Sequence, residues 1–82
     1  MRIDKFLNAV NITKRRAIAE DMLKNKVVLL NGSAVKKAKE VKVADIIELK
    51  YLEHSDRFQI LQIPLTKSTP KSKMEEYIQK LN

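Results

Sequence analysis

The sequence predicts an α+β fold: a two-helix hairpin packed on a small, mostly antiparallel sheet, with a short C-terminal helix. Three observations lead to this prediction. Apolar residues recur at helical spacing up to residue 23, and from residue 47 they alternate with charged residues at strand spacing. Asn31 and Gly32 stand between apolar runs and indicate a tight β-hairpin, because both turn positions require positive φ. With 82 residues, the chain suits one domain whose core is just large enough to fold.

Two helices are expected at the start of the chain. The first has an apolar stripe at positions i, i+3, i+4 and i+7, formed by Ile3, Phe6, Leu7 and Val10. Asn11 ends this helix, and Thr13 is a suitable N-cap for the second. One face of the second helix gathers Ile18, Ala19, Met22 and Leu23. Because the connection is short, the two helices should form a compact hairpin.

Strands follow the helices. The segment VVLLNGSAV, residues 27–35, forms the hairpin around the Asn-Gly turn. A basic connection leads to DIIELKYL, residues 45–52, where apolar and charged residues alternate as in a half-buried strand. EHSD turns the chain, and RFQILQI, residues 57–63, returns it as a further strand that Pro64 ends, because proline lacks an N–H for the ladder.

The last segment is expected to be a polar linker followed by a helix. Ser72 and Glu75 have the spacing of a capping box. Apolar residues repeat at helical spacing behind it, namely Met74, Tyr77, Ile78 and Leu81. We therefore expect a domain with a strand extension over residues 1–63, and a linker and C-terminal helix over residues 64–82 that pack on this domain.

The charge points to a polyanionic partner. Seventeen Lys and Arg oppose ten Asp and Glu, which gives a net charge of +7. Residues 1–50 hold twelve of these cations and six of the anions, so the positive field belongs to the first part of the chain. The alternative is a basic, solvated surface that keeps the protein soluble.

Composition also narrows the compartment. The longest unbroken run of branched apolar residues is VVLL, residues 27–30, whereas a membrane span needs about 20 apolar residues. The chain shows no apolar N-terminal segment of signal-peptide length, and it has no cysteine for disulfides or thiolate-bound zinc. We expect a cytoplasmic protein that does not enter a membrane.

Three cations stand at an unfavourable end of the second helix. If Thr13 caps it, Lys14, Arg15 and Arg16 fill its first turn, where the helix dipole disfavours each cation by about 0.3–1 kcal/mol. Unpaired backbone N–H groups and cations together suit a phosphate group. By the dipole argument alone, Arg16→Glu should leave helix stability unchanged or slightly higher. Arg15 starts on the core side and must extend outward or pair internally.

The first fifty residues resemble the S4-type RNA-binding domain. The matching motifs are R-x-D-K-F-L at Arg2–Leu7, I-x-K-x-R-x-x-A at Ile12–Ala19, V-x-x-N-G-x-x-V-K at Val28–Lys36 and V-x-x-x-D-x-I at Val41–Ile47. Two positions depart from the family, because Asn25 and Ala44 stand where glycine is usual. Asn tolerates a left-handed backbone and Ala tolerates it poorly, so we expect the first turn to be kept and the second to differ in shape.

The resemblance implies which residues contact RNA. In the family, the two helices and the following hairpin form the RNA-binding surface. Carried over by position, the family's basic residues fall on Arg2, Lys5, Lys14, Arg16 and Lys36. Together with the neighbouring Arg15 and Lys37, they are the predicted RNA-binding residues. Arg15 lies where relatives often have Ser or Thr, although K-R-R occurs in some. Asn31 and Gly32 carry over as the structural turn.

The resemblance also implies a function. The motifs begin at residue 2 and only about thirty residues follow them, which leaves no room for a catalytic domain. The chain therefore resembles free-standing, ribosome-associated members of the heat-shock protein fifteen and quality-control type. These bind ribosomal RNA and tRNA on the large ribosomal subunit and stabilise a stranded peptidyl-tRNA. The expectation is a non-enzymatic protein that needs no cofactor, metal or small-molecule substrate and is a monomer when free.

Two other classes of protein remain as alternatives. A helix-turn-helix DNA-binding regulator would also contain a helical hairpin, but a recognition helix favours base-reading Asn, Gln or Ser near its start, where this chain has three cations. An enzyme would have to use His54, the only histidine, with Glu53, Ser55 and Asp56. These are neighbours on a polar turn, whereas a catalytic site gathers residues from separate elements. We therefore interpret His54 as a surface residue.

Overall fold

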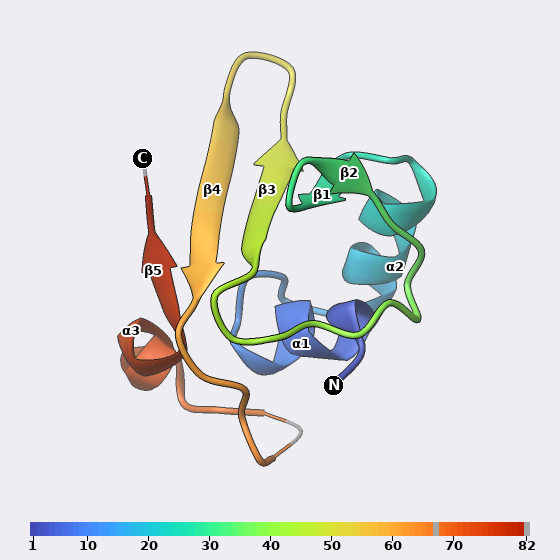
Figure 1. Ribbon diagram of the computed structural model, residues 1–82. Helices are drawn as coiled ribbons and strands as arrows, with labels where there is room; N and C mark the ends of the chain where they lie inside the picture. Colours follow the sequence, from blue (N-terminus) through green and yellow to red (C-terminus); the bar gives the residue numbers. More distant parts are fainter. Residues whose placement is uncertain (67, 82) are drawn as a thin grey trace.

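A computed structural model describes residues 1–66 and 68–81 (Figure 1). Its helices are α1 (Ile3–Ala9), α2 (Arg16–Lys24) and α3 (Met74–Tyr77), and a 3-10 turn over Lys71–Lys73 precedes α3. Its strands are β1 (Val28–Leu30), β2 (Ser33–Ala34), β3 (Ile46–Lys50), β4 (Ser55–Ile60) and β5 (Ile78–Lys80). The predicted α+β class, with a two-helix hairpin, an antiparallel sheet and a short C-terminal helix, is confirmed. None of the helices described is long and apolar enough to cross a membrane.

The strands form one antiparallel sheet in the order β2-β1-β3-β4-β5. Ile47 of β3 lies opposite Leu30 of β1 and Phe58 of β4, so these side chains share the face that packs on the helices. On β3, Ile47 and Leu49 are buried, whereas the flanking Ile46 and Lys50 are exposed. The alternation predicted for this strand is confirmed.

The core lies between this face of the sheet and the helical hairpin. Helix α1 supplies the three largest fully buried side chains, which are Phe6, Ile3 and Leu7. Figure 1 shows α1 and α2 gathered beside β1 and β3, whereas α3 lies at the other side of the sheet next to β5. The cationic start of α1 therefore belongs to a helix that is largely buried, whereas α2 adds only Ala19 and Leu23 to the core.

The Asn-Gly turn has the expected conformation, with φ of 52° at Asn31 and 88° at Gly32. The Asn31 side chain also reaches the start of β3. Its Oδ1 accepts a hydrogen bond from the Ile46 N–H at 2.9 Å, and its Nδ2 donates to Asp45 Oδ1 at 3.1 Å. The Asn31 side chain therefore joins the turn between β1 and β2 to the connection that leads into β3.

Helix α2 starts later than predicted, and Thr13 is not its N-cap. The N-cap is Arg15, which makes no side-chain capping bond, and Arg16 is the first helical residue. The N–H groups of Ile12 and Thr13 both donate to the Leu7 carbonyl, at 2.9 and 3.1 Å, so this segment closes the end of α1. Thr13 is buried there, and among the described residues its hydroxyl has no partner.

The buried face of α2 is narrower than the sequence predicts. Ala19 and Leu23, one turn apart, are buried, whereas Ile18 is 44% exposed. Met22 is half-buried and packs against the core. Arg15 is exposed ahead of the helix, so the expected conflict with the core does not arise.

Both turns in which glycine is usual in the family are formed. The left-handed residue of the first turn is Lys26, with φ of 60°, and not Asn25, whose φ is −83°. Asn25 instead donates its side-chain N–H to the Asp21 carbonyl at 3.0 Å. In the second turn Ala44 adopts φ of 77°, so this turn keeps a left-handed residue although alanine is poorly suited to it.

The predicted C-terminal helix is shorter than its apolar repeat. Helix α3 ends at Tyr77, and Ile78 continues in extended conformation as the start of β5. Ile78 is buried opposite Ile60 of β4, so pairing with β4 satisfies backbone groups that a longer helix would have left at the edge of the sheet. The capping box is absent, since Lys73 is the N-cap and makes no side-chain capping bond.

The linker before α3 is tied to α1. Thr69 donates both its N–H and its hydroxyl to the Ala9 carbonyl, at 3.0 and 2.9 Å, and its own carbonyl accepts from Asn11 Nδ2 at 2.9 Å. The C-terminal segment therefore contacts the helical hairpin as well as the sheet. The division of the chain at residue 63 stays a prediction.

The left-handed backbone at Ala44 gives a prediction about stability. Ala44→Gly should stabilise the fold by about 0.5–1 kcal/mol, because relief of the positive φ exceeds the added flexibility of the unfolded chain. The measurement is Tm by calorimetry, with an expected rise of about 2–8 °C. Gly32→Ala is the matched control. Its Cβ would meet no atom within 4 Å, yet φ of 88° should make it destabilising. If both changes lower Tm, the strain argument fails.

Candidate nucleic-acid interface

Five of the seven predicted cations lie at the starts of α1 and α2. Arg2 and Lys5 belong to the start of α1, and Lys14, Arg15 and Arg16 lead into α2. A small recess of about 180 Å³ between the helices is lined by Lys5 and Arg16 together with Met1 and Asn8. The structure therefore brings cations from both helices together. We call the five residues the N-terminal basic face.

A fully buried carboxylate holds two of these cations. The Asp4 side chain is 0% exposed, and its Oδ2 contacts Arg2 Nη2 at 3.0 Å and Arg16 Nη2 at 3.2 Å. Its Oδ1 accepts the N–H of Lys5 at 2.8 Å. The two guanidinium side chains remain 33% and 45% exposed, so each has one side fixed by Asp4 and N–H groups left for another anion.

Arg16 thus has a structural partner that the helix dipole argument did not include. It also contacts Glu20 one turn along α2, with 3.4 Å between Nε and Oε1. Glu20 in turn lies 3.9 Å from the Lys37 ammonium on the loop after β2. Arg16 and Lys37 therefore flank one carboxylate, which links the N-terminal basic face to this loop.

Lys14 and Arg15 differ from Arg2 and Arg16 in their surroundings. Both are exposed, and no carboxylate in residues 1–66 or 68–81 lies within ion-pair distance of either. They precede a helix whose start has no side-chain cap. Uncapped N–H groups at a helix N-terminus favour anions, and the two neighbouring side chains add charge at the same place. This combination suits a phosphate.

The N-terminus is fixed by an ion pair at the edge of the basic face. The Met1 ammonium lies 2.7 Å from Glu40 Oε2, and the Ile3 N–H donates to the Lys39 carbonyl at 2.7 Å. The ammonium lowers the pKa of Glu40, chiefly through this hydrogen bond and secondly through its positive charge. Because this pKa is lowered in the folded protein, the pair stabilises the fold near neutral pH, and the contribution is lost as the pH falls through the acid range.

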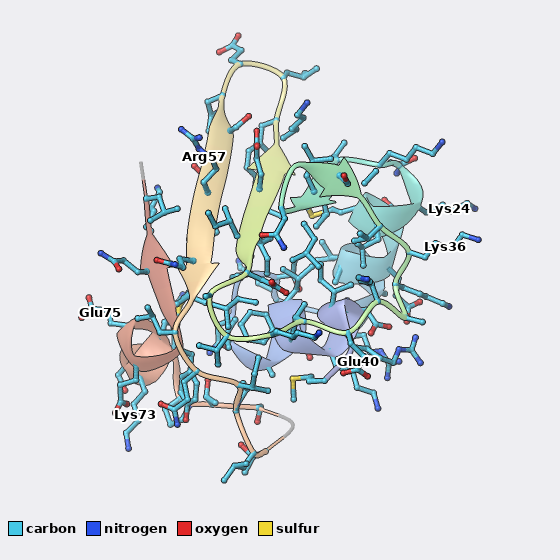
Figure 2. All side chains as sticks on the ribbon, viewed as in Figure 1. Lys24, Lys36, Glu40, Arg57, Lys73 and Glu75 are labelled. Atoms are coloured by element: carbon cyan, nitrogen blue, oxygen red, sulfur yellow. The ribbon has the colours of Figure 1, made fainter. Side chains whose placement is uncertain are left out.

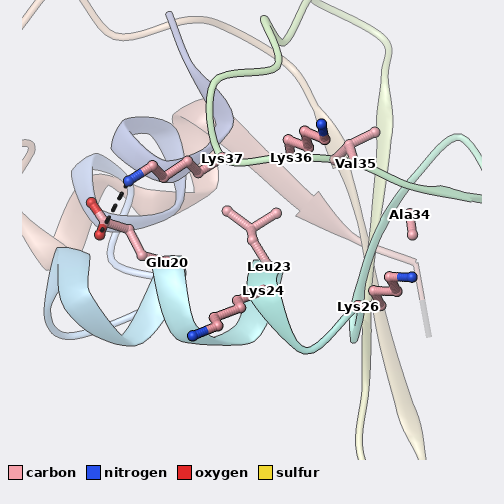
Figure 3. Close-up of a pocket in the computed structure, with 8 residues that line it drawn as sticks. All are labelled: Glu20, Leu23, Lys24, Lys26, Ala34, Val35, Lys36 and Lys37. Carbon is pink, nitrogen blue, oxygen red and sulfur yellow. Dashed lines mark ion pairs between the residues drawn. The ribbon is translucent and has the colours of Figure 1, made fainter.

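Lys36 lies apart from the N-terminal basic face. It lines a groove of about 660 Å³ between α2 and the loop after β2, together with Lys37 and two further lysines, Lys24 and Lys26 (Figure 3). Figure 2 shows Lys24 and Lys36 at the same edge of the molecule, beside α2, and Figure 3 places them on opposite walls of the groove. Lys24 and Lys26 belong to none of the sequence motifs. They line the same groove as Lys36 because the loop after β2 faces the end of α2.

The histidine of the possible enzyme site lies elsewhere. His54 is exposed in the turn between β3 and β4, at the end of the sheet that Figure 1 shows farthest from α1. Its ring stacks on Tyr51 at 4.7 Å, and its Nε2 is 3.9 Å from Asp56 Oδ1. The interpretation of His54 as a surface residue is confirmed. Within the described part of the chain, no group of three or more His, Cys, Asp or Glu residues is placed to hold a metal ion.

The pairing at Asp4 changes the expected effect of Arg16→Glu. The substitution removes one of the two guanidiniums that compensate a buried carboxylate and places a second negative charge beside it. We expect destabilisation by about 1–3 kcal/mol, with Arg2 still in place and Arg16 partly exposed. The measurement is urea unfolding followed by circular dichroism.

Arg15→Glu is the control for this prediction, because Arg15 is exposed and adjacent in the chain. It should change stability by no more than about 0.5 kcal/mol. If the two variants unfold at the same urea concentration, the contact with Asp4 contributes nothing to stability.

Comparison with known proteins identifies a family and several named relatives. The family model described as S4 domain matches residues 1–47. Two proteins named RQC P-site tRNA stabilizing factor, from Helicobacter pylori strains J99 and 26695, are each 49% identical over 78 residues, which cover 95% of this chain and 93% of theirs. A protein of the same name from Streptococcus pneumoniae is 33% identical over 51 residues, 62% of this chain and 58% of its own.

Solved structures agree with the fold. The solution structure of a hypothetical protein matches with a TM-score of 0.86 and 46% identity, over 100% of this chain and 98% of its own. The trimeric structure of Vibrio cholerae Heat Shock Protein 15 matches with a TM-score of 0.87 over 98% of this chain and 80% of its own, and at 24% identity it supports the fold alone. The chain belongs to the S4 domain family, in the group that contains the two Helicobacter pylori proteins.

Proposed function

We propose that this protein binds ribosomal RNA and tRNA on the large ribosomal subunit and stabilises a stranded peptidyl-tRNA in the P site during ribosome quality control. The observation that carries the proposal is 49% identity, over 95% of the chain, to proteins named RQC P-site tRNA stabilizing factor. The N-terminal basic face is the part of this chain suited to the task. The protein acts by binding and not by catalysis, in the cytoplasm, and it is a monomer when free.

The N-terminal basic face combines two kinds of phosphate contact. Arg2 and Arg16 are held by Asp4, so their guanidiniums are positioned before RNA arrives and less side-chain freedom is lost on binding. Lys14 and Arg15 are exposed beside the uncapped start of α2. There Lys14 offers a phosphate a point charge, and Arg15 offers it a planar fork of N–H donors. Such contacts fix position on RNA and carry little information on base sequence.

A DNA-binding regulator is the alternative. In such a protein the second helix would read bases with the side chains of its first turn. Here that turn starts with Arg16, whose guanidinium is engaged with Asp4 and Glu20. Competition experiments separate the two functions, because duplex DNA should displace labelled ribosomal RNA only at much higher concentration than unlabelled RNA does.

Salt should weaken RNA binding steeply. The seven predicted cations, less the two carboxylates Asp4 and Glu20 that contact them, leave five net charges. A plot of log affinity against log salt concentration should therefore have a slope at least as steep as roughly −3.5. The measurement is a titration of fluorescent ribosomal RNA at several potassium concentrations. A slope near zero would show that the cations only keep the protein soluble.

The ribosomal target gives a second prediction. A tagged copy should sediment with large ribosomal subunits that carry peptidyl-tRNA and should crosslink to that tRNA. Changing both Lys14 and Arg15 to Glu should lower this association by ten-fold or more, about 1.4 kcal/mol, without lowering Tm, because both side chains are exposed.

Glu75→Lys on α3 is the control and should leave association unchanged. Figure 2 shows Glu75 at the edge of the molecule opposite Lys24 and Lys36. Equal sedimentation with empty and with peptidyl-tRNA-carrying subunits would contradict the role in stabilising tRNA. Sedimentation of the protein without ribosomes measures its mass in solution and tests the prediction that the free protein is a monomer.

A further inference from the structure

We propose that the groove between α2 and the loop after β2 is a second phosphate-binding site for RNA, in which Lys24 and Lys26 act together with Lys36 and Lys37. This proposal rests on the proposed function, since it concerns the same partner. It adds a site at the opposite end of α2 from the N-terminal basic face. We call it the lysine groove (Figure 3).

The lysine groove has cations on two walls. Lys24 is the last residue of α2 and Lys26 lies in the turn that follows, whereas Lys36 and Lys37 belong to the loop that faces them. Figure 3 shows Leu23 pointing between the two walls, with Val35 on the loop side. The groove holds about 660 Å³, which is ample for a strand of phosphates and riboses.

The charge of the lysine groove is not balanced within the molecule. Glu20 is the acidic residue that lines it, and this carboxylate already contacts both Arg16 and Lys37. No carboxylate of the residues described lies within ion-pair distance of Lys24, Lys26 or Lys36. Figure 3 shows the Lys24 and Lys36 ammonium groups pointing apart and out of the groove, so these cations border the groove. Cations at its border attract anions, and here the anion must come from outside.

Lys26 provides an independent observation. Its φ is 60°, a left-handed backbone that is unfavourable for a residue with a Cβ. Glycine would form this turn at lower cost, and Asn25, a residue that tolerates such a backbone, stands one position earlier with an ordinary φ. Backbone strain concentrates where a side chain is used, and the Lys26 side chain lines the groove.

The chemistry of the lining favours a nucleic-acid backbone. Lysine ammonium groups on flexible stems follow phosphates of variable spacing. The apolar residues between them, Leu23 and Val35, are aliphatic and half-buried or buried, so they offer no ring on which a base would stack. We therefore expect contacts to phosphate and ribose that do not depend on base sequence.

The lysine groove meets the N-terminal basic face at Glu20, which contacts both Arg16 and Lys37, but its Lys24 lies farther away. Lys24 stands eight residues after Arg16 on α2, which corresponds to about 12 Å along the helix. This exceeds the Debye length of about 8 Å at physiological ionic strength, so Lys24 and Arg16 are largely screened from each other. Substitution of Lys24 should therefore add to substitutions in the N-terminal basic face.

The decisive variant is Lys26→Gly, because it removes a charge and relieves backbone strain at once. Tm should rise by about 2–8 °C, while affinity for large ribosomal subunits at 0.15 M salt should fall about four- to five-fold. The slope of log affinity against log salt should become shallower by about 0.7–0.9. Lys24→Gln should lower affinity and slope by the same amounts without raising Tm.

Two controls separate charge from backbone strain. Ala44→Gly relieves another left-handed backbone without a change of charge, so Tm should rise and binding should stay as in the parent. Lys73→Gln removes a lysine beside α3, on the far side of the molecule in Figure 2, and should change neither. If Lys26→Gly and Lys24→Gln bind as the parent does, the inference is wrong.

The failures of the two proposals are distinguishable. If the Lys14 and Arg15 reversal abolishes binding but the groove variants do not weaken it, the proposed function stands and the lysine groove is not a site. If the parent does not bind large subunits, both are overturned. Ribosomal RNA extracted from the large subunit is the second probe. Weaker binding of Lys26→Gly to intact subunits, with unchanged binding to this RNA, would assign the groove to an acidic ribosomal protein and overturn the RNA contact.

Discussion

The interaction on which the rest depends is the buried carboxylate of Asp4. An isolated charge in the core would cost several kcal/mol, so its position is tolerable only with Arg2, Arg16 and the Lys5 N–H around it. Because Arg2 precedes α1 and Arg16 opens α2, the same carboxylate fixes the two helix starts relative to each other. It also lowers the mutual repulsion of two arginines that would otherwise be driven apart. The basic face is therefore a product of the core as much as of the surface.

Local signals in the sequence predicted the local parts of the fold. The turn at Asn31 and Gly32 needs only its own two residues, and the strand at Ile46–Lys50 is visible in its alternation. The errors arose where a partner outside the element itself decided the outcome. Thr13 has the chemistry of an N-cap, but its backbone closes α1 by bonding to Leu7. Ile78 fits a helical repeat, but the open edge of β4, far back in the chain, draws it into β5.

For the candidate site, the sequence predicts which cations are present but not how they pair. The cations themselves follow from charge and from the family motifs, which locate Lys14 and Arg16 by spacing alone. Their pairing does not follow, because the burial of Asp4 and the position of Glu20 between Arg16 and Lys37 are tertiary facts. The two replaced glycines show the same limit. The sequence marks the turns as unusual, but only the backbone reveals that the strain falls on Lys26 and Ala44.

The two outermost strands of the sheet are short, and their length affects whether copies of this protein aggregate by pairing their strands. Strand β2 has two residues and β5 has three, so each edge offers few unpaired backbone groups. The longer β4, which would present six residues, is covered by β5 along part of its length. Long open edges are templates for strand addition between molecules and hence for aggregation. The C-terminal segment thus shields the sheet from its own copies, and the molecule meets its surroundings through charge and not through backbone pairing.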